Sequence, residues 1–216
     1  ILATATIVGL GVTRGIGNAV NILMPILFAL LLLLLWYAFK NGEFQKGLNF
    51  MFAADFSKLT SQSVLIAMGH AFFTLSLGMG TVMVYGSYMS NDQSISSAVI
   101  VVAGLDTLIA LIAGMAIFPL VFASGLAPGS GPGLLFETLP IAFSGMWGGA
   151  FFGTGFFVLV AIAALSSSIS LIEPGIAWLE KLGSSRLLAT VGLSLLCWLG
   201  GVASIYSSEV FDRLDY

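Results

Sequence analysis

Long apolar runs alternate with short polar stretches along this chain, a pattern that predicts helices crossing a membrane. The runs at 20–39, 95–122, 150–178 and 186–206 are each long enough to cross a hydrocarbon core, which takes about 20 residues. The run at 1–13 is about 18 Å long as a helix, against a core of about 30 Å. The sequence therefore predicts four complete spans here and a first span that is cut short, with a loop around residues 14–18 after it.

A fifth complete run, at 63–89, carries Ser76, Gly78 and Gly80 near its middle. Each glycine destabilises a helix interior by about 1 kcal/mol relative to alanine, so we expect a broken helix at about 70–88. Hydrocarbon cannot satisfy the freed backbone groups, and the break must be buried in protein or line a wet cavity. The carbonyl end of the first half would suit a cation and the N–H end of the second half an anion. The alternative is a glycine kink that only lets a neighbouring helix pack closely.

Composition agrees with this pattern, because 58% of the 216 residues are hydrophobic and 8% are charged. We therefore predict an all-α integral membrane protein with one partial transmembrane domain. The net charge of −3 comes without a basic stripe, which argues against nucleic acid as a partner. A cap loop is expected at 123–149, because its Pro- and Gly-rich start leads into an apolar stretch. A short polar tail is expected at 207–216.

Polar side chains at membrane depth are the candidates for function. His70 and Thr74 share a helix face, and Asp106 lies near the centre of its run, where a carboxylate costs roughly 2.5–3.5 kcal/mol on insertion. With the serines at 166–168 they offer the oxygen ligands that hard cations prefer. The serines suit helix packing equally well, and His70 suits a hydrogen-bonded core histidine. No nucleophile, phosphate-loop or paired metal-ligand motif is present, so no enzyme activity is predicted.

Three motifs together resemble one family. They are Phe72-Phe-Thr-Leu-Ser-Leu-Gly-Met-Gly80, Tyr85-Gly-Ser-Tyr88 and Leu165-Ser-Ser-Ser-Ile169, which resemble the neurotransmitter:sodium symporters, in particular their bacterial amino-acid-transporting branch. The resemblance implies a fragment of a leucine-transporter-like inverted-repeat fold, from the fourth helix, cut short, to the ninth. We then expect the missing helices of the parent transporter to be partners and this chain alone to be inactive.

The resemblance also implies a role for individual residues. Those expected at the substrate are Phe73, Thr74, Ser76, Met79, Ser167 and Leu171. Those expected at two sodium ions are Thr74 and Asp106 for one, and Ala163, Ser166 and Ser167 for the other. Those expected to replace a chloride site are His70, Asp106 and Ala110, and the gate residues are Phe73 and Tyr88.

The function expected from this resemblance is sodium-coupled symport of a neutral, large apolar amino acid by alternating access. Sodium ions are the expected cofactors, with no organic cofactor, and the partners are the amino-acid substrate and the lipid bilayer. The expected location is the inner (plasma) membrane, crossed several times. The alternative is a membrane subunit or truncated gene product that does not transport.

Overall fold

The computed structural model describes residues 1–90, 92–129 and 131–207, and within that part of the chain every regular element is helical. Four helices there are long and apolar enough to cross a membrane: Val12–Asn41, Ile95–Ala123, Gly149–Lys181 and Arg186–Tyr206. The predicted all-α membrane fold is confirmed. The polar tail predicted at 207–216 lies outside the described residues from 208 onward.

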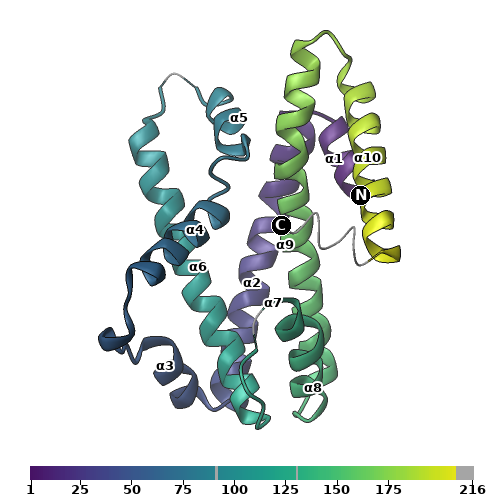
Figure 1. Ribbon diagram of the computed structural model, residues 1–216. Helices are drawn as coiled ribbons and strands as arrows, with labels where there is room; N and C mark the ends of the chain where they lie inside the picture. The colour runs from purple at the N-terminus through teal and green to yellow at the C-terminus, as the bar shows by residue number, and fades with distance from the viewer. Residues whose placement is uncertain (91, 130, 208–216) are drawn as a thin grey trace. The chain divides into compact units, whose positions relative to one another are not determined.

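The α-helices, labelled in Figure 1, are α1 (Leu2–Gly9), α2 (Asn18–Asn41), α3 (Phe44–Phe52), α4 (Ser61–Thr74), α5 (Thr81–Ser87), α6 (Ile95–Ala123), α7 (Gly131–Gly133), α8 (Leu139–Ser144), α9 (Gly149–Lys181) and α10 (Arg186–Tyr206). Two π-helical segments, Val12–Gly17 and Leu134–Thr138, and one 3-10 turn, Phe56–Lys58, complete the described elements. The polar stretch after α2, expected as a loop, therefore contains α3 and the 3-10 turn. Asp55 precedes that turn and accepts the Ser57 hydroxyl and N–H. These bonds, with Lys58 beside them, hold the pKa of Asp55 below its ordinary value.

The loop expected around residues 14–18 is wrong, because this stretch is π-helical and runs directly into α2. Gly11, with φ of 88°, separates it from α1, and the Ile16 N–H donates to the Gly11 carbonyl at 3.1 Å. A Cβ added to Gly15 would overlap the carbonyl of Ile7. The sequence signal of a loop was these glycines, which instead permit a close helical turn.

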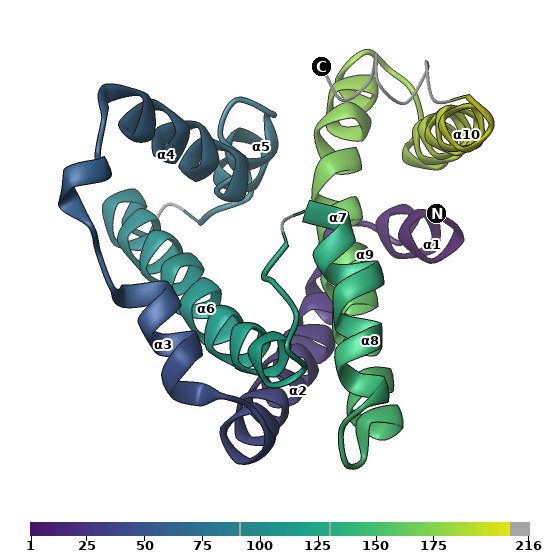
Figure 2. The same cartoon turned by 60° about the horizontal axis from the view of Figure 1, so that its bottom comes forward.

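Contacts between Cα atoms divide the chain into two compact units, and the chain passes from one to the other within α2, between α4 and α5, between α5 and α6, and within α9. The first unit comprises Ile1–Leu23, Gly78–Met89 and Ala164–Tyr216. In it α1 lies beside α10 in both views (Figures 1 and 2). Its buried apolar residues are Val8, Ile16, Ile169, Ile176 and Ala189. The single domain expected from the sequence stays a prediction.

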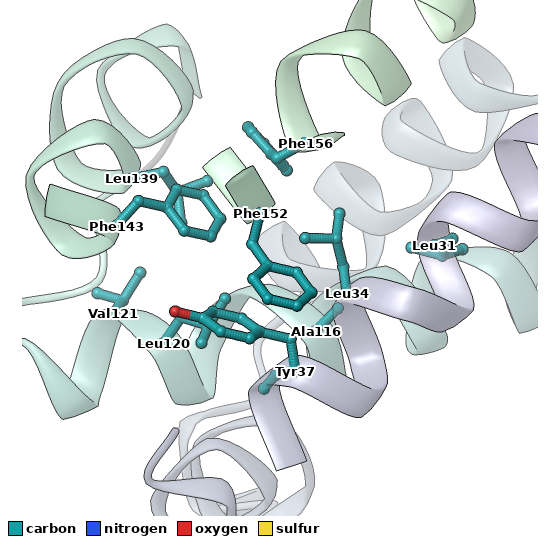
Figure 3. Packing of buried hydrophobic residues seen from close by; sticks show 11 residues of the cluster. Leu31, Leu34, Tyr37, Ala116, Leu120, Val121, Leu139, Phe143, Phe152 and Phe156 are labelled. Carbon is teal, nitrogen blue, oxygen red and sulfur yellow. The ribbon is translucent and has the colours of Figure 1, made fainter. Parts of the chain in front are cut away.

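The second unit comprises Met24–Leu77 and Ser90–Ala163 and holds the larger apolar core. Figure 3 shows this core, where the Tyr37 ring of α2 stacks on Phe152 of α9 with centroids 3.9 Å apart. The buried Tyr37 hydroxyl donates to the Trp147 carbonyl at 2.7 Å. Because a buried phenol needs a hydrogen-bond partner, this bond fixes α2 to the turn before α9. The segment expected as a cap loop carries α7 and α8, and α8 packs on α6.

Candidate functional site

The interruption between α4 and α5 is present, which confirms the predicted broken helix. Ser76, Gly78 and Gly80 all have positive φ, at 54°, 85° and 79°. Ser76 is the one non-glycine residue with positive φ in the described part of the chain. Three left-handed residues within five cannot continue a right-handed helix, and Figure 1 shows the chain leaving α4 before α5 begins.

The last turn of α4 ends in a hydrogen-bond pattern that uses most of its terminal carbonyls. The Leu75 N–H donates to Ala71 O at 3.1 Å, the Ser76 N–H to Phe73 O at 3.0 Å, and the Leu77 N–H to Phe72 O at 2.9 Å. The last two bonds form a Schellman motif, with Ser76 in the left-handed position that glycine usually occupies.

Thr74 supplies the remaining terminal carbonyl of α4. Among the described residues, no hydrogen bond of the structure reaches this Thr74 carbonyl oxygen. A helix leaves four carbonyls without intrahelical partners, and the terminus carries partial negative charge. The three bonds of the last turn satisfy the carbonyls of Ala71, Phe72 and Phe73, which leaves the Thr74 carbonyl oxygen for another partner.

A carboxylate from α6 meets Thr74 at this end of α4. The Thr74 hydroxyl lies 3.2 Å from Asp106 Oδ2 and donates to it, and it also lies 3.4 Å from Ala71 O. His70, expected beside Asp106, is exposed, and no hydrogen bond joins the two in the described part of the chain. Thr74 and Asp106 thus place a carbonyl, a hydroxyl and a carboxylate on one small region, the oxygen ligands that suit a hard cation.

Other predicted site residues in the second unit lie on the same helices. Phe73 is 72% exposed and precedes Thr74 on α4, whereas Ala110 lies one turn after Asp106 on α6 and is exposed. Ala163 is half-buried on α9. The structure therefore brings Thr74 and Asp106 together by a hydrogen bond and places Phe73 and Ala110 beside them in the chain.

The serines of α9, in the first unit, divide between two environments. Ser168 pairs with the Thr4 hydroxyl of α1 at 2.7 Å, and Ser170 pairs with the Tyr85 hydroxyl of α5 at 3.0 Å. Ser167 is exposed and Ser166 is half-buried. Packing between helices, the alternative considered for this cluster, thus accounts for Ser168 and Ser170.

Met79 and Leu171, expected at the substrate, are 39% and 54% exposed in the first unit. Met79 precedes α5, and Leu171 lies on α9 one turn after Ser167. Both side chains are apolar and more than a third exposed, so both present apolar surface.

A charged cluster in the first unit was not assigned from the sequence. Glu173 of α9 is fully buried. Its two carboxylate oxygens accept hydrogen bonds from Arg186 Nη2, at 2.7 and 2.9 Å. Arg186 Nη1 donates to Glu180 at 3.0 Å, and Arg186 Nε donates to the Val8 carbonyl near the end of α1 at 2.9 Å. The signal that could have found it is Glu173 itself, an ionisable residue inside an apolar run, which requires a partner.

Tyr88, the expected gate residue, joins this cluster by donating its hydroxyl to Glu173 Oε1 at 2.8 Å. Thr81 of α5 donates to the Ser170 carbonyl at 3.2 Å, so α5 and its end are held to α9 at several points. Charge-assisted bonds of this kind are stronger than neutral ones. The cluster therefore fastens α1, α5, α9 and α10 together.

Comparisons with known proteins agree with these features. The sequence profile of the sodium:neurotransmitter symporter family matches residues 1–212. An uncharacterized sodium-dependent transporter of Haemophilus influenzae is 34% identical over 100% of this chain and 50% of its own length. The sodium-dependent transporter YhdH of Bacillus subtilis is 38% identical over 99% of this chain and 50% of its own length.

A solved structure gives the same result. The crystal structure of MhsT in complex with L-phenylalanine is 46% identical in sequence, with a TM-score of 0.83, over 94% of this chain and 46% of that chain. The chain thus spans about half the length of the relatives it matches. On the profile match and on these relatives, the chain belongs to the sodium:neurotransmitter symporter family.

Proposed function

We propose that the full-length protein containing this chain is a symporter that couples sodium to the uptake of a neutral amino acid with a large apolar side chain. The observation that carries the proposal is the end of α4, where the Thr74 hydroxyl donates to the Asp106 carboxylate and no hydrogen bond among the described residues reaches the Thr74 carbonyl. Family membership supports it, because the family is one of sodium:neurotransmitter symporters. The mechanism proposed is alternating access around the broken helix.

At the first proposed sodium site, Thr74 and Asp106 provide oxygen ligands of graded charge. The carbonyl end of α4 carries partial negative charge, and the Asp106 carboxylate supplies a formal charge when ionised. A sodium ion bound there would compensate the negative charge of the Asp106 carboxylate. In the structure this carboxylate accepts a hydrogen bond from the Thr74 hydroxyl at 3.2 Å. At the second site we propose the Ala163 carbonyl with the hydroxyls of Ser166 and Ser167, an assignment that rests on residue type and sequence position.

The proposed substrate residues combine backbone groups with an apolar wall. Ser76, which has a left-handed backbone, and Met79 are proposed to line the pocket around the amino group and the side chain of the substrate. Met79 and Leu171 supply an adaptable apolar wall, and Phe73 is proposed to close over the substrate. Thr74 and Ser167 complete this set, which contains no charged side chain. A neutral substrate is favoured because a charged one would be desolvated without a partner. L-phenylalanine is bound by the relative MhsT.

We also propose that Asp106, with His70 and Ala110, replaces a chloride ion. A fixed carboxylate beside sodium supplies the negative charge that a bound chloride would bring. An opposite charge nearby favours the ionised form of a carboxyl group. When sodium leaves, Asp106 is proposed to take up a proton, directly or shared with His70. The alternative is a structural role with no titration during the cycle.

The remaining parts of the proposal concern the gate, the location and the other segments of the protein. Tyr88 is proposed to act at the cytoplasmic gate through its bond to Glu173, and the cap loop at 123–149 is proposed to be extracellular. The protein is proposed to cross the plasma membrane several times and to need no organic cofactor. Helices outside this chain would complete both sodium sites, so the 216 residues alone would not transport. The second candidate, a non-transporting subunit, is favoured by no feature of the site.

The test is sodium-driven uptake of radiolabelled L-leucine into proteoliposomes that contain the full-length protein. Leucine, tryptophan and tyrosine should compete, and glycine and glutamate should compete weakly. Met79→Phe should shift preference toward smaller side chains, while Met83→Phe, a change at an exposed methionine of α5, should not. Uptake that ignores the sodium gradient would refute the proposed symport, and strong preference for glycine or glutamate would refute the apolar pocket alone.

A further inference from the structure

The amphipathic helix α3 lies directly beside the ends of two membrane-spanning helices. It begins at Phe44, three residues after α2 ends at Asn41. Its polar side chains Gln45, Lys46 and Asn49 are exposed on one side, and the Gln45 amide donates to Asn49 at 3.4 Å. At about 100° per residue these three fall within one arc of the helix, opposite Gly47.

The buried side of α3 crosses α6 at close range. The Glu43 N–H, just before α3, donates to the Pro119 carbonyl at 2.9 Å. A Cβ added to Gly47 would lie 2.6 Å from Pro119 Cγ, and one added to Gly114 would lie 2.6 Å from the end of the Met51 side chain. The contacts of α3 thus cover α6 from Gly114 to Phe122, because Phe50 packs against Phe118 and Phe122 while the end of the Met51 side chain reaches Gly114.

The register on α6 places α3 at the edge of the hydrocarbon core. α6 has 29 residues and its centre falls at Ile109, so Pro119 lies about 15 Å and Gly114 about 7.5 Å from that centre along the axis. Half of a hydrocarbon core is about 15 Å. The contact of α3 with Pro119 therefore lies at the boundary between headgroups and acyl chains.

Aromatic rings remain uncovered at this depth. Phe50 packs against Phe118 and Phe122 of α6, with centroids 4.8 and 5.6 Å apart, yet it is 52% exposed. Phe52, at the end of α3, is 53% exposed. Aromatic residues are enriched at membrane interfaces, and amphipathic helices lie there with the apolar side toward acyl chains.

We propose that α3 is an interfacial helix that binds the phospholipid bilayer, with Phe50 and Phe52 against acyl chains and the polar arc toward the headgroups. If α3 moved away from the acyl chains, the Phe52 ring would be exposed to water. The cost of that exposure holds α3 at its depth. The inference concerns the anchoring of α3 and does not depend on which substrate the protein transports.

Spin labels on single cysteines test this placement in the full-length protein, reconstituted in phosphatidylcholine nanodiscs with Cys197 and any other cysteine replaced by serine. One label replaces Phe52, a second replaces Gln45, and a lipid-exposed reference replaces Val101 of α6, which is 54% exposed. Collisions with oxygen report acyl chains, and collisions with a water-soluble nickel chelate report solvent. We expect the Phe52 label to collide with oxygen and to be shielded from the nickel chelate, and the Gln45 label to be open to the chelate.

Two results would overturn the proposal. Equal access of nickel to both labels would show that α3 lies in water. A Phe52 label shielded from oxygen and nickel alike, with the Val101 label open to oxygen, would show that another protein segment covers this surface.

Discussion

The two units of this chain each contain a carboxylate within or beside a membrane-spanning helix, and they treat it differently. Glu173 is fully buried and receives two bonds from Arg186 and one from Tyr88. Asp106 is half-buried and receives one bond, from the Thr74 hydroxyl, among the described residues. Glu173 is neutralised by a cation of the chain itself, while Asp106 has a neutral donor.

This difference separates a fastening role from a binding role. A buried ion pair is costly to form, and removing one partner is also costly because the other charge stays buried without compensation. The pair of Glu173 and Arg186 therefore holds its helices in one arrangement. A carboxylate at membrane depth without a cationic side chain needs either a proton or an ion. Asp106, bonded to the hydroxyl of the last residue of α4, therefore suits a reversible cation, which is the role proposed for it.

The largest expected effect comes from removing the cation of the Glu173 cluster. Arg186→Met should lower the free energy of unfolding by about 3 kcal/mol, because Glu173 stays buried without its counter-charge. SDS titration of the full-length protein in mixed micelles measures this change. Glu180→Gln is the matched control, since Glu180 is the partly exposed partner of Arg186 and such pairs contribute about 0–1 kcal/mol. Adding Glu173→Leu to Arg186→Met should restore most of the loss, and no recovery would mean that Arg186 acts through other contacts.

A smaller effect, on ion binding instead of stability, is expected at Asp106. Asp106→Asn should weaken sodium affinity in transport by roughly tenfold, equivalent to about 1.4 kcal/mol, because the site loses its formal charge. Uptake measured against sodium concentration reports it, with Thr107→Val as control, since that hydroxyl bonds its own helix at Ala103 O. Asp106→Asn combined with Ala110→Ser should also make uptake respond to chloride. Chloride dependence in the unmodified protein, or unchanged sodium affinity in Asp106→Asn, would contradict the role given to Asp106.

The smallest effect is expected for the tyrosine of the Glu173 cluster. Tyr88→Phe removes one hydroxyl bond to a carboxylate that keeps Arg186, so it should lower the free energy of unfolding by about 1 kcal/mol. A double-mutant cycle with Glu173→Gln should give a coupling of similar size. Tyr85→Phe, which loses only a bond to Ser170, should show no coupling to Glu173. If the effects of Tyr88→Phe and Glu173→Gln were additive, the bond between Tyr88 and Glu173 would contribute nothing to stability.

The sequence was informative wherever local chemistry decides the outcome. Uninterrupted apolar runs require helices in a membrane, and Ser76, Gly78 and Gly80 in one run required a break, which α4 and α5 show. The stretch at 14–18 was misread as a loop, although it is helical, because glycine occurs both where a chain reverses and where a helical turn packs closely. Asp106 was singled out by its position in an apolar run, although its bond to Thr74 could not be read from spacing on two separate helices.

What only the tertiary structure decided is which polar groups meet. The sequence alone determined an all-helical membrane protein with a broken span and polar groups at its depth, because these features depend on neighbours along the chain. Pairing of Glu173 with Arg186, assignment of Ser168 and Ser170 to helix contacts, and the free carbonyl of Thr74 depend on side-chain direction and on how helices pack. The partners in these contacts are far apart along the chain, so the hydropathy pattern does not predict them. Only the packed fold brings each donor to its acceptor.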